Sequence, residues 1–165
     1  KMQERYKAST GKEFNLELVL DFALVRNPLE RMWLFKYFRS EACYKMIETY
    51  PDAVYSILKL KEVHEIYFIT ARPNLPKIQE VTRETLKEYF EIPNPAQSII
   101  FCKAEDKVRI AKNLDIKVLI EDNINVGAIP PEIRILLLKR EWNKKINNSG
   151  VEVVDSWKEI LDKLL

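Results

Sequence analysis

Hydrophobic residues recur at helical spacing through the first third of the chain. The pattern predicts four helices, at residues 1–9, 15–25, 29–50 and 51–60. Gly11 suits the end of the first helix, and Pro28 and Pro51 suit the first positions of the third and fourth. The chain therefore opens with an all-helical segment. Because Lys1 already lies in helical sequence, we expect the natural N-terminus to lie upstream.

After residue 60 the pattern changes to alternating strands and helices. Short apolar runs typical of buried strands lie at 66–69, 98–101, 118–120, 133–138 and 151–154. Helices are expected at 75–90, 107–114 and 157–165, with Asp106 and Ser156 as N-cap residues of the last two. Strands joined by helices at this spacing predict βαβ units. We therefore expect an α/β fold with a parallel sheet covered on both faces.

Composition narrows the class of protein. The chain has 165 residues, enough for one domain with a substantial core, and 27 Lys and Arg against 25 Asp and Glu give a net charge of +2. That balance gives no electrostatic reason to expect binding to a nucleic-acid polymer or a membrane surface. No apolar run is long enough to span a membrane. The two cysteines favour a reducing compartment, so we expect a cytoplasmic protein.

Two residue types are scarce enough to exclude whole mechanisms. His64 is the only histidine, which rules out a histidine-cluster metal site and argues against a catalytic triad that uses histidine. The three glycines, Gly11, Gly127 and Gly150, are too far apart for the common glycine-rich phosphate loops. Any phosphate chemistry must therefore use another arrangement.

Four polar residues are expected to converge at one edge of the sheet. Thr70 follows one strand and the pair Glu121-Asp122 follows another, and in such folds ligands bind beyond the carboxyl ends of the strands. Lys107 opens a helix of about eight residues, which descends roughly 12 Å. The next strand climbs back about 16 Å, so Lys107 and the acids lie side by side.

These side chains suit phosphoryl chemistry. A threonine hydroxyl and the N–H groups after it donate to phosphate oxygens, a lysine offers a compact positive charge, and adjacent carboxylates bind Mg²⁺. Taken singly, Thr70 and Lys107 are more often a turn residue and a solvated lysine, and Glu121-Asp122 is as often a loop cap. The order along the chain, threonine first and acids last, is the stronger signal. It argues against a response-regulator receiver, in which the acids come first.

Three stretches resemble sequence motifs of the haloacid dehalogenase-like (HAD) superfamily. They are 66–73 (IYFITARP), 106–107 (DK) and 118–123 (VLIEDN), which look like its motifs II, III and IV. The pair Trp142-Asn143 and the stretch 153–160 resemble the 5′(3′)-deoxyribonucleotidase-like branch of that superfamily. The similarity covers about residues 50–165.

The resemblance implies a fold and a reaction. The fold is a HAD-like, Rossmannoid three-layer parallel sheet, with a helical cap at residues 1–50 and the core at 51–165. The reaction is that of a Mg²⁺-dependent, 5′-nucleotidase-like phosphatase acting on nucleoside monophosphates through an aspartyl-phosphate intermediate. Its partner is a small phosphorylated, nucleotide-like substrate, and a homodimer is left open.

The resemblance also implies roles for particular residues. Thr70 and Lys107 are catalytic, and Lys107 neutralises the phosphate and orients the nucleophile. The phosphate-binding set is Thr70, Ala71, Arg72 and Lys107, and the Mg²⁺ set is Asp122 with Glu121 in support.

One part of the superfamily's machinery is missing from the chain. An aspartate acts there as nucleophile, and a second aspartate two residues on acts as general acid and base. The nearest stretch, Leu20-Asp21-Phe22-Ala23, has alanine at the second position and helical spacing. We therefore expect the D-x-D motif upstream of Lys1. The alternative is a non-catalytic relative that binds a phosphorylated ligand or regulates without a nucleophile.

Two further expectations concern single side chains. The aromatic residues Trp33, Phe35, Tyr37 and Phe38 either stack a nucleobase or form the core of a helix pair. Lys107 stands where the helix dipole disfavours a positive charge, so its replacement by methionine is expected to leave stability unchanged or slightly higher.

Overall fold

The computed structural model describes residues 2–13, 27–92, 95–123, 129–140, 143 and 150–165. The chain divides into two compact units, Lys1–Ile47 with Leu75–Val81 and Glu48–Asn74 with Thr82–Leu165. The division into a cap at 1–50 and a core at 51–165 stays a prediction, and the expected helix at 15–25 lies outside the described residues. In the part of the chain that the structure describes, no helix is long and apolar enough to cross a membrane.

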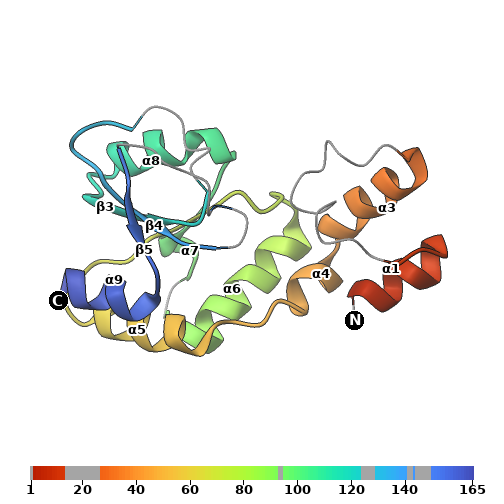
Figure 1. The fold of residues 1–165 in the computed structure, drawn as a ribbon. Coiled ribbons are helices and arrows are strands. Elements are labelled where there is room, and N and C mark those ends of the chain that lie inside the picture. The colour runs from red at the N-terminus through yellow and green to blue at the C-terminus, as the bar shows by residue number, and fades with distance from the viewer. Residues whose placement is uncertain (1, 14–26, 93–94, 124–128, 141–142, 144–149) are drawn as a thin grey trace. The chain divides into compact units, whose positions relative to one another are not determined.

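The smaller unit is built from helices whose ends are fixed by local polar contacts (Figure 1). They are α1 (Met2–Thr10), α3 (Pro28–Phe38) and α4 (Glu41–Lys45). The first helix ends where expected, because Gly11 has a φ of 71° and its N–H donates to the Lys7 carbonyl at 2.8 Å. Asn27 caps α3 ahead of Pro28, with its Oδ1 accepting from the Leu29 N–H at 2.9 Å.

The predicted single helix at 29–50 is wrong. The chain breaks between α3 and α4 at Ser40, whose φ of −102° and ψ of 143° are extended. Ser40 Oγ donates to the Tyr37 carbonyl at 2.7 Å, and the Tyr44 hydroxyl donates to the Phe38 carbonyl at 3.0 Å. These bonds occupy carbonyls that a continuing helix would use. The spacing of hydrophobic residues does not reveal these two hydrogen bonds.

The larger unit alternates helices and strands, as predicted. Its helices are α5 (Pro51–Lys61), α6 (Pro76–Phe90, whose first turns belong to the smaller unit), α7 (Pro95–Ser98), α8 (Lys107–Asn113) and α9 (Trp157–Leu164). Its strands are β1 (Phe68–Thr70), β2 (Ile99–Phe101), β3 (Val118–Glu121), β4 (Arg134–Leu138) and β5 (Glu152–Val154). Ser156 caps α9 as expected, accepting from the Glu159 N–H at 3.1 Å. Asp106 holds the N-cap position of α8 but makes no side-chain capping bond there.

The strands pair in parallel, as predicted, but in two sheets rather than one. β1 pairs with β2, and β3, β4 and β5 form a second sheet with β4 in the middle. Among the described strands, β4 alone is paired on both sides, so β1, β2, β3 and β5 each have one edge without a described partner. The described strands therefore do not form the one parallel sheet that the sequence predicts.

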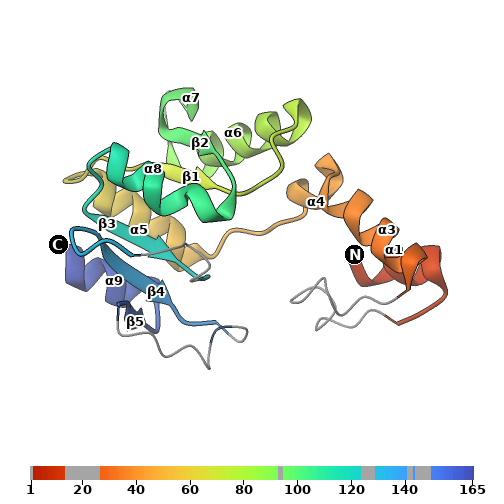
Figure 2. The same ribbon diagram turned by 90° about the horizontal axis from the view of Figure 1, so that it is seen from above.

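Helices cover both faces of the three-stranded sheet (Figure 2). α8 lies over one face, where Val108 packs in a cluster with Leu119 of β3. α5 and α9 lie side by side over the other face, where Ile160 packs with Leu136 of β4. β1 shares the α8-side packing, since Ile69 packs against the same cluster as Leu119. The two sheets are therefore joined by side-chain packing although their edges are not hydrogen-bonded.

Candidate functional site

An ion pair lies at the carboxyl end of β3, the edge at which ligands bind in this class of sheet. Glu121 is the last residue of β3, and Lys107 is the first residue of α8. Lys107 Nζ donates to Glu121 Oε1 at 2.6 Å, with 16% of the lysine side chain and 7% of the glutamate side chain exposed. The lengths of the helix and the strand predict this neighbourhood correctly. They do not predict the pairing, because the resemblance implies a metal-supporting role for Glu121 instead.

Burial raises the pKa of the Glu121 carboxyl above its ordinary value, because the charged form loses its water. The hydrogen bond and the charge of the Lys107 ammonium act in the opposite direction and lower that pKa in part. The neighbouring Asp122 carboxylate adds to the rise. The carboxyl group at this edge therefore holds a proton more tightly than a carboxyl group in water.

We expect Glu121 to make stability depend on pH. The pKa of Glu121 is higher in the folded chain than in the unfolded chain. At a pH between these two pKa values the folded chain therefore binds more protons than the unfolded chain. As pH rises through this range, the contribution of Glu121 to the free energy of unfolding falls. Each tenfold difference in proton affinity is worth about 1.4 kcal/mol. Urea unfolding from about pH 4 to about pH 7 should show the wild type losing stability relative to Glu121→Gln. A constant difference across that range would contradict the expectation.

Thr70 ends β1 and begins a hydrogen-bonded turn. Its Oγ1 accepts from the Arg72 N–H at 3.2 Å, so the hydroxyl hydrogen remains to donate to a phosphate oxygen. Ala71 is exposed. Arg72 is half-buried, and its Nη1 donates to the Oγ1 of buried Thr82 on α6 at 3.0 Å. The guanidinium thus ties the turn to α6, a contact that the sequence does not indicate.

Cys102 links Thr70 to the ion pair. Its N–H donates to the Thr70 carbonyl at 3.0 Å. Burial raises the pKa of the Cys102 thiol, and the charges of Lys107 and Glu121 also reach it. Thr70, Lys107 and Glu121 therefore gather in one region of the larger unit. The raised pKa keeps the thiol protonated, which makes it a poor nucleophile.

Asp122 follows Glu121 directly and is exposed. Mg²⁺ takes oxygen ligands and is commonly held by one or two carboxylates together with water. Asp122 fits that pattern, whereas the Glu121 carboxylate is buried and already bonded to Lys107. Within the described residues, no group of three or more His, Cys, Asp and Glu side chains could hold a metal ion. A cation at Asp122 would need its remaining ligands from water, from a substrate or from outside those residues.

A buried asparagine lies behind Asp122. Asn143 is 4% exposed, and its Nδ2 donates to the carbonyls of Asp122 and Leu138, each at 2.9 Å. Its Oδ1 accepts from the Arg140 N–H at 2.7 Å. In the sequence this asparagine stands out only together with Trp142, as a point of resemblance, and Trp142 lies outside the described residues. An asparagine shortly after a strand is too common a signal to reveal these contacts.

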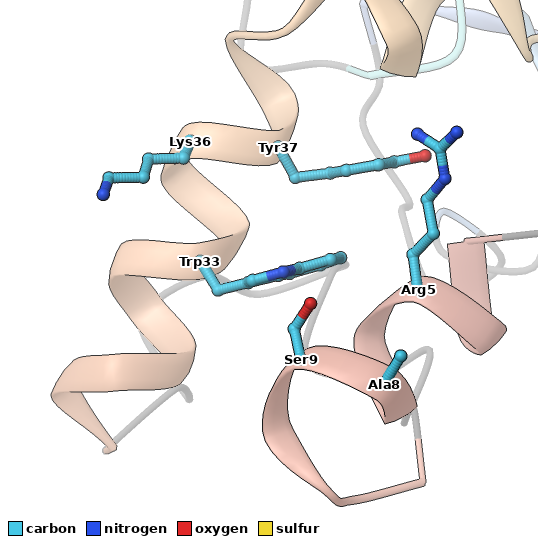
Figure 3. A pocket seen from close by; sticks show the side chains of 6 residues that line it. All are labelled: Arg5, Ala8, Ser9, Trp33, Lys36 and Tyr37. Carbon is cyan, nitrogen blue, oxygen red and sulfur yellow. The ribbon is translucent and has the colours of Figure 1, made fainter.

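The smaller unit contains a pocket of about 370 Å³ (Figure 3). It is lined by Arg5, Ala8 and Ser9 of α1 and by Trp33, Lys36 and Tyr37 of α3. Trp33 stacks on Tyr37, with ring centroids 5.0 Å apart and planes at 7°, and Tyr6 meets Trp33 edge-on at 5.2 Å. Figure 3 places the Arg5 guanidinium beside the Tyr37 hydroxyl. Tyr37 is buried and Trp33 half-buried, so both rings pack between α1 and α3 and also line the pocket, while Phe35 is 55% exposed. The choice between a helix-pair core and a nucleobase platform stays open.

Comparison with known proteins gives two distant similarities. No protein-family model matches the sequence. The chain is 29% identical over 118 residues to "Putative nucleotidase OB0422" of Oceanobacillus iheyensis, covering 70% of this chain and 61% of that protein. It is 26% identical over 156 residues to "Putative nucleotidase BH1399" of Halalkalibacterium halodurans, covering 90% of this chain and 76% of that protein. The chain thus spans less than two thirds of the first of these relatives, and both carry the name nucleotidase.

Proposed function

We propose that the full-length protein is a Mg²⁺-dependent phosphatase that hydrolyses nucleoside monophosphates. The observation that carries the proposal is the Lys107–Glu121 ion pair at the carboxyl end of β3, with Thr70 in the same region and Asp122 exposed beside it. A cation and a hydroxyl donor can bind a phosphate group, and an exposed carboxylate beside them can hold a metal ion. The two similar proteins named nucleotidase support the class of reaction and the nucleotide substrate.

Each residue has a role that its contacts allow. The Thr70 hydroxyl donates to a phosphate oxygen, and the same Oγ1 accepts from the Arg72 N–H and so stabilises the turn. Lys107 turns from Glu121 toward the arriving phosphate, whose negative charge is larger than that of one carboxylate. Glu121, whose side chain is 7% exposed, holds the Lys107 ammonium at the sheet edge until the phosphate arrives. Arg72 orders the phosphate-binding turn through Thr82.

Asp122 would hold the Mg²⁺ ion, with Glu121 in support. When bound, the cation would neutralise charge on the phosphate oxygens and help to fix the phosphate in place. Asp122 suits this role because it is exposed and follows the last paired residue of β3, so its carboxylate meets solvent at the sheet edge.

The proposal places the nucleophile on a strand before Lys1, carrying the D-x-D motif of the HAD superfamily. The edges of β1 and β3, each paired on one side among the described strands, would accept such a strand in parallel. Ile69 of β1 and Leu119 of β3 already pack in one cluster, so the two edges face a common region. An aspartate there would attack phosphorus and form an aspartyl-phosphate, while the second aspartate of the motif protonates the departing nucleoside oxygen. Water would then hydrolyse the aspartyl-phosphate and release inorganic phosphate.

The decisive test of the metal site is Asp122→Asn in the full-length protein. We expect Mg²⁺ affinity to fall roughly tenfold or more, because the substitution removes a charged oxygen ligand and keeps the shape of the side chain. The melting temperature should stay near that of the wild type, since Asp122 is exposed. Isothermal titration of both forms with Mg²⁺ makes the measurement. Equal affinity would remove Asp122 from the site.

Phosphate release from a panel of nucleoside monophosphates tests the reaction itself. We expect the wild type to be active and to require Mg²⁺. The sequence before Lys1 separates this proposal from the alternative of a phospho-ligand binding protein. A D-x-D motif there supports the enzyme, whereas its absence together with inactivity on every nucleotide would favour the binding protein.

A further inference from the structure

We propose that Asn143 is a positioning residue that fixes the backbone of Asp122 and thereby sets the affinity of the edge for Mg²⁺. The inference rests on the proposed function, because it gives Asp122 the role of metal ligand.

The backbone pairing between β3 and β4 ends at Glu121, one residue before Asp122. Its last pair is Glu121 with Leu137. The next position would place Asp122 opposite Leu138, and both of their carbonyls accept from Asn143 Nδ2 at 2.9 Å. A side-chain amide thus continues the connection between the two strands where the backbone ladder stops. Asp122 is held in line with β3 although it lies beyond the strand.

The chemistry of the contact calls for an asparagine. Its amide supplies N–H donors for two carbonyls, and its oxygen accepts from the Arg140 N–H at 2.7 Å. An aspartate of the same shape has no donor and would set a carboxylate against two carbonyl oxygens. An alanine would leave the Asp122 and Leu138 carbonyls without this bond in a site that is 4% exposed.

A purely structural role predicts a different outcome. If Asn143 only anchors its own loop, removing it lowers stability and leaves the metal site unchanged. If it positions Asp122, removing it loosens residues 119–123 and weakens Mg²⁺ binding as well. Residues that orient metal ligands typically change metal affinity by about 10–100-fold when they are replaced.

The test uses Asn143→Ala in the full-length protein, with Ser56→Ala as a matched control. Ser56 is also buried, at 1% exposure, and its Oγ donates to the Trp157 carbonyl at 3.2 Å, within the same unit but on α5. Three quantities are measured for each form: the melting temperature, the Mg²⁺ dissociation constant by titration calorimetry, and hydrogen exchange of the peptide covering residues 119–123 without metal.

We expect both variants to melt at a lower temperature than the wild type. Only Asn143→Ala should exchange faster at 119–123 and bind Mg²⁺ about tenfold more weakly. A Mg²⁺ affinity within about twofold of the wild type, with unchanged exchange, would overturn the inference. If Asn143→Ala does not fold, Asn143→Ser, which keeps one donor, takes its place. Failure of both to fold would assign Asn143 to stability alone and overturn the proposal too.

The outcomes separate this inference from the proposed function. A wild type that binds Mg²⁺ and loses it in Asp122→Asn, but not in Asn143→Ala, contradicts the role of Asn143 and leaves the proposed function intact. A wild type that binds no Mg²⁺ overturns the proposed metal site and this inference with it. If Asn143→Ala exchanges faster at residues 119–123 but binds Mg²⁺ as tightly as the wild type, Asn143 holds the backbone there. The proposal that it sets the Mg²⁺ affinity is then wrong.

Discussion

Replacing Lys107 by methionine is expected to lower kcat/KM for phosphate release by about 10²–10³-fold, the cost of removing one strong donor aimed at developing charge. Stability is also expected to fall at neutral pH, by about 3 kcal/mol, because the buried Glu121 carboxylate loses its partner. This reverses the expectation from the sequence, where the helix dipole alone makes the lysine unfavourable. The contact with Glu121 outweighs the dipole, which is worth only about 0.3–1 kcal/mol.

The double variant Lys107→Met with Glu121→Gln separates the two effects. Without the buried carboxylate, the uncharged pair should recover much of the lost stability, while activity stays as low as in Lys107→Met. Phosphate release and urea unfolding of the wild type, both single variants and the double variant make the measurement. A Lys107→Met protein as active as the wild type would remove Lys107 from the site. Equal stability of Lys107→Met and the double variant would reject the penalty assigned to Glu121.

Leu136→Ala is expected to lower the free energy of unfolding by about 2–5 kcal/mol. Leu136 is fully buried at the centre of β4, is paired with Ile120 of β3 and Glu152 of β5, and packs with Leu60 and Ile160. Shortening it removes apolar contact and leaves a cavity that neighbours on three elements border. Denaturant unfolding monitored by circular dichroism measures the change.

Val153→Ala in the adjacent strand β5 provides the control for that change. Val153 is 48% exposed, so the same kind of truncation leaves no cavity and should cost below about 1 kcal/mol. Equal losses in the two variants would mean that Leu136 does not lie in the core of the larger unit.

The parts of the fold that follow from local pattern could be predicted. Helices α5 and α6 begin within one residue of their expected starts, because Pro51 and Pro76 lie at positions that suit a helix N-terminus. The parallel pairing follows from strands joined by helices, and the neighbourhood of Lys107 and Glu121 follows from element lengths. Each of these depends on residues that are close in sequence or on simple geometry.

The parts that depend on single polar contacts could not be predicted. Ser40 and Tyr44 interrupt a run of helical spacing by bonding to nearby carbonyls, and spacing does not encode hydroxyl geometry. The Arg72–Thr82 bond joins two elements, and Asn143 reaches a carbonyl 21 positions earlier in the chain. The pairing of Lys107 with Glu121 likewise depends on the burial of both side chains, which only the folded structure reveals.

The Lys107–Glu121 pair has a consequence for solution behaviour that is independent of catalysis. Strand edges paired on one side, such as those of β1 and β3 among the described strands, are templates on which other chains can add and aggregate. Natural sheets counter this with short strands and with charges that point inward near the edge. β1 has three residues and β3 has four, and β3 ends in a buried carboxylate with a lysine bonded to it. In the proposed enzyme the D-x-D strand occupies these edges, and before it pairs, short strands and an inward-pointing charge limit what a foreign strand could gain there.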